Sequence, residues 1–192
     1  MTRHTALAAA VAALSLTFAS TAGAQAQAMP HFGISAGASI PESTFGESVN
    51  TGYNLNAMVN VTVPLSPVGF RLEGGWNRFD LSSGNGDGNV RVANGSANVV
   101  LIPSAVMTAK PYLIAGVGAY NVKTSIDNTG TLLTGAFTSE SSDTRIGFNG
   151  GIGLMFGLGP IGSMLEARYV SVSGKNGGGS LAYIPVSFGV TF

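Results

Sequence analysis

Apolar and polar side chains alternate with a period of two along most of the chain. In YNLNAMVNVTV (53–63) every odd position is apolar, and four of the five even positions are polar. Successive side chains of a strand point to opposite faces, whereas a helix would scatter these residues around its circumference. The segment therefore predicts a β-strand. The same alternation recurs in seven further segments: 32–40, 68–77, 94–101, 112–120, 145–156, 164–169 and 183–192.

Two of these segments interrupt the rule, because Val100 and Ile114 place apolar side chains in the polar row. The connections differ in length. Those at 64–67, 102–110 and 157–160 are tight or moderate, and those at 40–50, 80–93, 121–144 and 172–180 are mostly longer. The pattern predicts eight antiparallel strands in up-and-down order, with short turns at one end and longer loops at the other.

The two faces of these strands carry different residues. One row is rich in Leu, Ile, Val and Phe, and the interleaved row is mainly Gly, Ser and Asn, with some Arg and Glu. A soluble barrel keeps its apolar side inside, and a core of Gly and Asn would bury too little apolar area to fold. We therefore expect the apolar row to face lipid. A sheet in hydrocarbon must close, because an open edge leaves backbone groups unpaired. The sequence thus predicts an all-β fold, an eight-stranded antiparallel up-and-down transmembrane β-barrel.

The composition agrees with this fold. Charged residues make up 9 % of the chain and the mean hydropathy is +0.33, against about 25 % charged residues in soluble domains. Cys is absent, which removes disulfides and cysteine metal sites from consideration. The 9 Lys and Arg residues balance the 9 Asp and Glu residues, so no basic face is expected and nucleic acid is not a predicted partner.

The N-terminus has the order of regions found in a secretory signal peptide. Arg3 precedes the apolar run 6–19, and the small, polar STAGAQAQA follows. The run is shorter than the roughly 20 residues that a membrane-spanning helix needs. We expect export, with cleavage after Ala24, Ala26 or Ala28. Residues 1–28 are then the signal peptide and 29–192 the barrel.

Four segments carry a resemblance to a known family: KPYLIAGVGAY (110–120), RIGFNGGIGLMF (145–156), MLEARYV (164–170) and YIPVSFGVTF (183–192). The chain resembles the small outer-membrane β-barrel proteins of Gram-negative bacteria, of the OmpA/OmpX-like type, over residues 30–192. The resemblance implies an outer-membrane location, contacts with outer-membrane lipids, and biogenesis with periplasmic chaperones and the barrel-assembly machinery. It also implies a C-terminal assembly signal, which here comprises Phe192, Val190 and Phe188.

Two clusters of charge lie inside the predicted strands, and all four of their residues fall on the lumen face: Arg71, Glu73, Glu166 and Arg168. Their strands, the third and the seventh, stand opposite each other in an eight-stranded barrel, whose interior is only as wide as its side chains. The four could form a gate or a narrow ion path. Because buried charges are seldom left unpaired, we favour a structural plug in which they neutralise one another.

An aromatic girdle is expected at each membrane interface, where such rings prefer to lie. The up-and-down order places Tyr53, Trp76, Phe148 and Tyr169 near the outer rim, and Phe70, Phe156 and Phe192 near the periplasmic rim.

The sequence offers little chemistry for catalysis. His31 is the one histidine outside the predicted signal peptide, and no recognisable nucleophile motif lies near it. GNGDGN (84–89) lacks the first Asp and the distal Glu of an EF-hand loop. We therefore predict no catalytic, cofactor or metal site.

The function expected from the sequence is that of a monomeric, non-enzymatic envelope protein, structural or surface-interacting through its loops. The sequence predicts no particular ligand for the loops. Two alternatives remain open, a narrow passive channel for ions or small solutes and an outer-membrane lipid-modifying enzyme.

Overall fold

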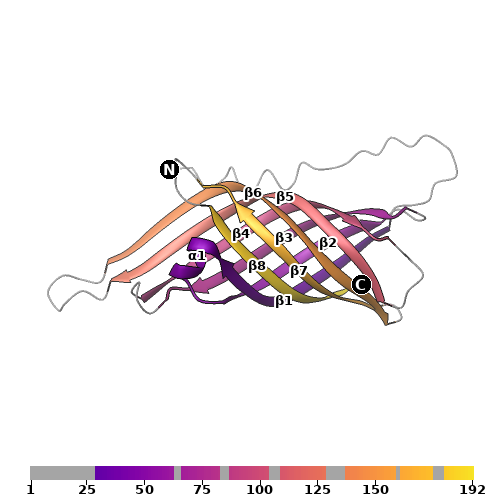
Figure 1. The fold of residues 1–192 in the computed structure, drawn as a ribbon, viewed down its shortest axis with the longest axis horizontal. Coiled ribbons are helices and arrows are strands. Elements are labelled where there is room, and N and C mark those ends of the chain that lie inside the picture. Colours follow the sequence, from indigo (N-terminus) through magenta and orange to yellow (C-terminus); the bar gives the residue numbers. More distant parts are fainter. Residues whose placement is uncertain are drawn as a thin grey trace, which may run out of the picture.

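The computed structural model describes residues 29–62, 66–82, 87–103, 109–128, 137–158, 161–174 and 180–192. These form eight strands and one short helix: β1 (Met29–Glu42), α1 (Ser43–Ser48), β2 (Gly52–Thr62), β3 (Val68–Asp80), β4 (Asp87–Leu101), β5 (Ala109–Asn128), β6 (Phe137–Leu158), β7 (Ile161–Val172) and β8 (Leu181–Thr191). Each strand pairs with its neighbours in sequence, and β8 returns to β1. The predicted closed, antiparallel, eight-stranded barrel is confirmed (Figure 1).

The predicted signal peptide, residues 1–28, lies outside the described residues. No helix in the described part of the chain is long and apolar enough to cross a membrane.

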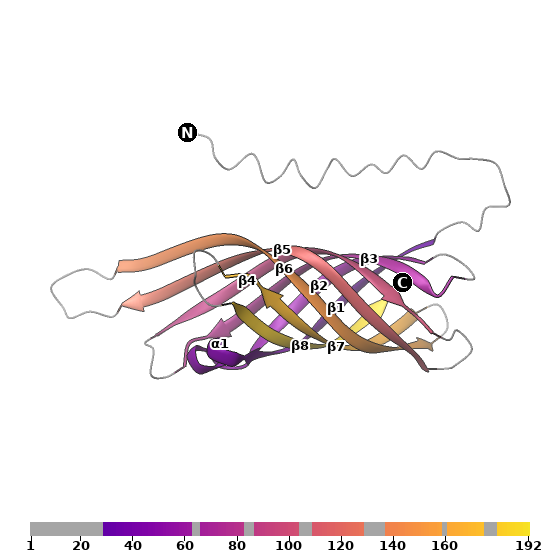
Figure 2. The same ribbon diagram turned by 45° about the horizontal axis from the view of Figure 1, so that its top comes forward.

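The barrel has two distinct ends. At the turn end, β2 leads to β3, β4 to β5 and β6 to β7, and both the start of β1 and the end of β8 lie there. At the loop end, α1 lies beside β1 and β8, while β5 and β6 extend beyond the other strands (Figures 1 and 2).

The closing seam joins β1 to β8 through the last residue of the chain. The Phe32 amide donates to the Phe192 carbonyl at 3.0 Å, and the Phe192 amide donates to the Phe32 carbonyl at 2.9 Å. Pairing continues from Gly33 opposite Thr191 to Glu42 opposite Ala182. With no open edge at this seam, its backbone groups are satisfied without water.

The apolar row of each strand faces outward. Large apolar side chains on all eight strands are extensively exposed, including Phe32, Leu55, Phe70, Val99, Val117, Ile152, Leu165 and Phe188. The residues that alternate with them are mostly buried, and glycine and polar side chains are frequent among them. This inversion of a soluble fold is what an apolar solvent around the barrel requires.

The strands at the loop end are longer than the sequence predicted. The segment 121–144 is predicted as a long loop, but residues 121–128 continue β5 and residues 137–144 belong to β6. This prediction was wrong because the protruding strands leave the apolar zone. Their outward positions there are polar (Asn121, Lys123, Ser142, Thr144), so the contrast between faces that marks a lipid-facing strand disappears.

The lumen is not polar throughout, contrary to the sequence-based expectation. Buried apolar side chains fill the barrel at the loop end; we call this group the loop-end cluster, comprising Val49, Phe79, Val90, Val92, Tyr120, Val122, Val170, Val172, Leu181 and Tyr183. Phe45 of α1 packs edge-on against Phe79 at 5.1 Å between ring centroids, and Phe79 packs in the same way against Tyr183 at 5.5 Å. The interior therefore resembles a soluble core at this end.

The two residues that break the alternation, Val100 and Ile114, also face inward. They pack with Tyr112 in a smaller turn-end cluster, where they are buried. Both deviations in the sequence therefore reflect an apolar layer inside the barrel rather than a change of face.

Candidate functional site

The lumen charge cluster, formed by Arg71, Glu73, Glu166 and Arg168, lies inside the barrel between the two apolar groups. The structure brings the four side chains together from β3 and β7, and each of these side chains is at least 92 % buried. At i and i+2, the two charges of each strand share the inward face. Arg precedes Glu on β3 and Glu precedes Arg on β7, so opposite charges meet across the lumen.

The cluster is a closed ring of alternating charge. Arg71 Nη1 lies 2.7 Å from Glu166 Oε2 and 3.9 Å from Glu73 Oε2. Arg168 places Nη2 2.5 Å from Glu73 Oε2 and Nε 2.5 Å from Glu166 Oε1. Each carboxylate contacts both guanidinium groups. The four formal charges sum to zero, which is the arrangement that makes burial of charge tolerable.

Neighbouring polar side chains complete the hydrogen bonds of the ring. Arg71 Nε donates to Asn60 Oδ1 at 2.7 Å, and the Tyr112 hydroxyl donates to Glu166 Oε2 at 2.5 Å. The guanidinium carbon of Arg71 also lies 5.6 Å from the centroid of the Tyr112 ring. Because a buried polar network is stable only when its members are satisfied, these contacts fix the positions of the charges.

Tyr112 and Asn60 are members of the site that the sequence did not single out. Both lie on the inward face that the alternation predicts, so their face could be read from the sequence. Their contact with the charges depends on how far each strand is shifted against the next, which the alternation does not specify.

A network of Asn and Ser side chains fills the neighbouring part of the lumen. Ser39 Oγ donates to Asn77 Oδ1 at 2.8 Å, Ser187 Oγ donates to Asn54 Oδ1 at 2.8 Å, and Asn54 Nδ2 donates to Ser39 Oγ at 3.1 Å. A cavity of about 20 Å³ remains between this network and Arg168. That volume holds about one water molecule.

Glycine is required where the packed interior approaches the wall. A Cβ built on Gly153 would overlap the Tyr112 ring, and one built on Gly116 would overlap the Asn98 side chain. The inward glycines therefore allow the lumen to be filled by larger side chains from the facing strands.

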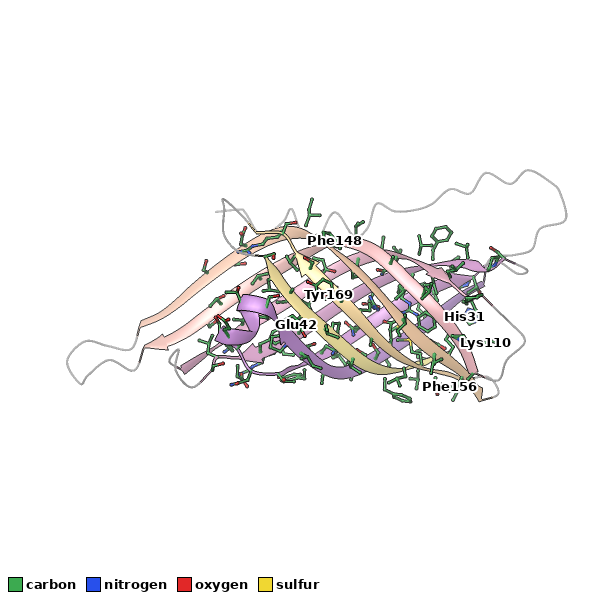
Figure 3. The ribbon with its side chains drawn as sticks, in the orientation of Figure 1. His31, Glu42, Lys110, Phe148, Phe156 and Tyr169 are labelled. Carbon is green, nitrogen blue, oxygen red and sulfur yellow. The ribbon has the colours of Figure 1, made fainter. Side chains whose placement is uncertain are left out.

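The predicted aromatic residues lie on the outer face. Tyr53, Phe70, Phe148 and Tyr169 are about half exposed, and Trp76 and Phe156 are partly buried. The Tyr53 and Trp76 rings contact each other at 5.5 Å. Figure 3 places Phe156 near the turn end, and Phe148 and Tyr169 closer to the loop end.

His31 is exposed at the turn end, on β1 opposite Asn60 of β2 (Figure 3). Among the described residues, no group of three or more His, Asp or Glu side chains could hold a metal ion. Of the GNGDGN segment, residues 84–86 lie outside the described residues and 87–89 begin β4.

Comparisons with known proteins agree with the geometry. The profile of the family described as "Outer membrane protein beta-barrel domain" matches residues 9–192. A search of curated protein sequences found no match.

Among solved structures, Neisserial surface protein A is similar with a TM-score of 0.65 and 18 % identity, over 86 % of this chain and 97 % of that one. A major outer membrane protein from Thermus thermophilus is similar with a TM-score of 0.62 and 14 % identity, over 85 % and 99 % of the two chains. At these identities the likeness shows the fold alone.

Proposed function

Because the chain belongs to the outer membrane protein β-barrel domain family, we propose that it acts as a non-enzymatic, non-conducting protein of the bacterial outer membrane, with a structural role and a surface-interaction role. The observation that carries the proposal is the filled lumen. Going along the barrel, the turn-end cluster, the lumen charge cluster, the Asn and Ser network and the loop-end cluster follow one another.

A filled lumen argues against the passive channel. A permeant ion would have to displace a charge ring held by contacts of 2.5 to 2.7 Å and then cross a layer of buried Val, Phe and Leu. The packed aromatic pairs from Phe45 to Tyr183 cover the same end. Displacing the apolar layer costs the free energy of its packing, and displacing the charge ring costs the free energy of its ion pairs.

Single-channel recording in planar bilayers tests this part of the proposal. The purified protein should show no discrete conductance steps. A double variant, Arg71→Ala with Phe79→Ala, should conduct if the two layers are what closes the lumen, and Phe188→Ala on the outer face is the matched control. Regular conductance of the unaltered protein would refute the proposal.

The surface-interaction role is supported by the protruding part of β6. Pairing of β6 with β7 begins at Gly147 opposite Val172, whereas β6 itself starts at Phe137 and pairs with β5 over its whole protruding length. The β7-facing edge of the protruding segment thus has no partner strand among the described residues. Such an edge is a template for pairing with an extended segment of another protein.

A photo-crosslinking amino acid placed at Ser142 on intact cells tests the surface role. Ser142 is exposed on the protruding segment of β6, and a discrete protein adduct is expected from this position. The same amino acid at Val99, on the lipid-facing side, is the control and should give none. Absence of any protein adduct from Ser142 would contradict the surface role.

A further inference from the structure

The ladder of hydrogen bonds between β7 and β8 is interrupted at one place in the wall of the barrel. Pairing runs up to Ala167 opposite Val186 and resumes at Val170 opposite Tyr183. Two residues intervene on each strand, so the register is the same on both sides of the interruption. Both strands continue through it. The wall is therefore continuous in its backbone but incomplete in its hydrogen bonds.

Pro185 is the cause of the interruption. The unchanged register places it opposite Arg168. Alternate residues of an antiparallel strand direct their amide and carbonyl groups to opposite neighbours. Phe192 exchanges both of its backbone bonds with Phe32 of β1, so Pro185, an odd number of residues earlier, directs its backbone to β7. Proline has no N–H group. The Arg168 carbonyl thereby lacks the donor that the ladder would supply.

A carbonyl without a donor is costly in this part of the wall. Proline in a sheet is normally confined to an edge strand or a bulge, but β8 is bonded to both β7 and β1 in the closed barrel. A backbone group without a partner is strongly unfavourable where lipid surrounds the wall. No side-chain donor to the Arg168 carbonyl is recorded among the residues that the structure describes. The carbonyl therefore needs a donor from outside the ladder.

The small cavity in the lumen lies beside this interruption. It measures about 20 Å³, and Arg168, Val170 and Pro185 are among the residues that line it. A cavity of this size holds about one water molecule, provided that two to four polar groups surround it. Its position and its volume therefore match a single small donor for the carbonyl.

Polar side chains on the other walls of the cavity supply the remaining hydrogen bonds. Tyr183 lines the cavity, and its hydroxyl accepts from Asn77 Nδ2 at 3.5 Å, which leaves the hydroxyl proton for another acceptor. Glu73 lines it as well, and its carboxylate accepts hydrogen bonds. A water molecule in the cavity can donate to the Arg168 carbonyl and to Glu73 and accept from Tyr183. Three bonds are the usual number for a buried water.

We propose that the barrel binds one water molecule at Pro185, which donates to the Arg168 carbonyl in place of the missing N–H group of the ladder. The same water contacts Glu73 and Tyr183, so it joins the wall to the lumen charge cluster. The volume is too small for a larger solute, and the neutral cluster offers no net charge to an ion. The site rests on the closed barrel and does not depend on whether the lumen conducts.

The interruption lies toward the outer interface, where water is at hand. Tyr169 follows Arg168 on β7 and falls within the interrupted part. Figure 3 places Tyr169 closer to the loop end than to the turn end. Tyrosine rings prefer the level of the headgroups, which is hydrated, unlike the centre of the bilayer. A proline is therefore accepted in β8 at a depth where its missing donor can be replaced by water.

Solid-state NMR of the isotope-labelled protein in phosphatidylcholine bilayers tests the proposal through magnetisation transfer from water to carbonyl carbons. A cross-peak between water and the Arg168 carbonyl carbon is expected in the unaltered protein. Pro185→Ala supplies the missing N–H group, so this cross-peak should be lost and the new amide at position 185 should be protected from hydrogen exchange. Val186→Ala is the matched control and should keep the cross-peak, because Val186 adjoins Pro185 but occupies an outward position.

Val170→Ile alters the cavity and leaves the ladder as it is. The added methyl group occupies the space of the water, so the cross-peak at Arg168 should disappear while the carbonyl remains without a donor. The midpoint of urea unfolding in lipid vesicles should fall. In the Pro185→Ala background the same substitution should lower the midpoint less, because the carbonyl no longer needs the water.

Absence of a water cross-peak at Arg168 in the unaltered protein would overturn the proposal. A cross-peak that persists in Pro185→Ala, or one that is lost in Val186→Ala, would overturn it as well. An equal fall of the urea midpoint on Val170→Ile with and without Pro185→Ala would show that the added methyl group only overpacks the lumen and that no water serves the carbonyl.

Discussion

Arg71 and Glu166 are joined by an ion pair of 2.7 Å across the lumen, although 95 residues separate them in the chain. The pair links opposite walls of the barrel, and Tyr112 and Asn60 hold its two ends. Such a buried pair need not stabilise the fold relative to an apolar one. Removing only one of the two charges is nevertheless costly, because the remaining charge stays buried without its partner.

The first prediction follows from this pairing. Arg71→Met and Glu166→Gln should each destabilise the barrel by about 3–5 kcal/mol, because each leaves a buried charge without its partner. The double variant should recover part of that loss. Urea titration of the protein in lipid vesicles gives the three free energies of unfolding, and their cycle gives the coupling. Additive losses would mean that the two residues do not act as a pair.

A second prediction concerns Gly153. Gly153→Ala should destabilise the barrel by about 1–3 kcal/mol, since the added methyl group overlaps the Tyr112 ring and forces it away from Glu166. Gly95→Ala is the matched control and should change the free energy of unfolding by less than about 0.5 kcal/mol. Equal effects of the two substitutions would show that Tyr112 does not need its observed position.

The third prediction compares two positions of β6 on either side of the outer rim. Ile152 lies midway between Phe148 and Phe156 and is 64 % exposed. Ile152→Arg should therefore destabilise by about 2–4 kcal/mol, as expected for Arg at the bilayer midplane. Ser142→Arg, on the protruding part, should be nearly neutral. A neutral Ile152→Arg in the same vesicle assay would place this strand outside the hydrocarbon zone.

The fourth prediction concerns the C-terminal residue. Deleting Phe192 removes both backbone hydrogen bonds with Phe32 and the proposed assembly signal. The amount of protein in the outer membrane should fall more than the yield of refolding in detergent. Phe192→Ala keeps the backbone bonds and separates the two effects, since it should lower only the amount in cells. Normal surface levels of the deletion variant would contradict the assembly role.

The alternation of the sequence, together with the need to close a sheet in hydrocarbon, was sufficient to predict the closed barrel and the two faces of its lipid-facing part. This prediction succeeds between the two aromatic girdles. There, lipid outside and the packed lumen inside impose opposite preferences on neighbouring positions of a strand. Val122 and Lys123 show where it fails. At these two positions the outward side chain is polar and the inward one apolar, which is the reverse of the lipid-facing pattern.

The site shows a second limit. The alternation places Arg71 and Glu166 on the lumen face, but it does not tell whether Arg71 meets Glu166 or only its neighbour Glu73. That choice depends on the shift between strands, which results from the hydrogen-bond ladders of the whole barrel. The proximity of Arg78, Arg91 and Lys123 was missed for the same reason, because these residues become neighbours only in the register of β3, β4 and β5.

The pairing of β3 with β7 inside the barrel has a consequence for the order of events in time. Contacts between residues so distant in the chain form slowly, since a long loop must first be closed. While the β1–β8 seam is still open, Arg71, Glu73, Glu166 and Arg168 face water or lipid without their cross-lumen partners. We therefore expect seam closure and charge neutralisation to occur together, because a half-closed barrel lacks both the β1–β8 hydrogen bonds and the cross-lumen ion pairs. The ring of charges should then make the last step of barrel formation cooperative and its reversal slow.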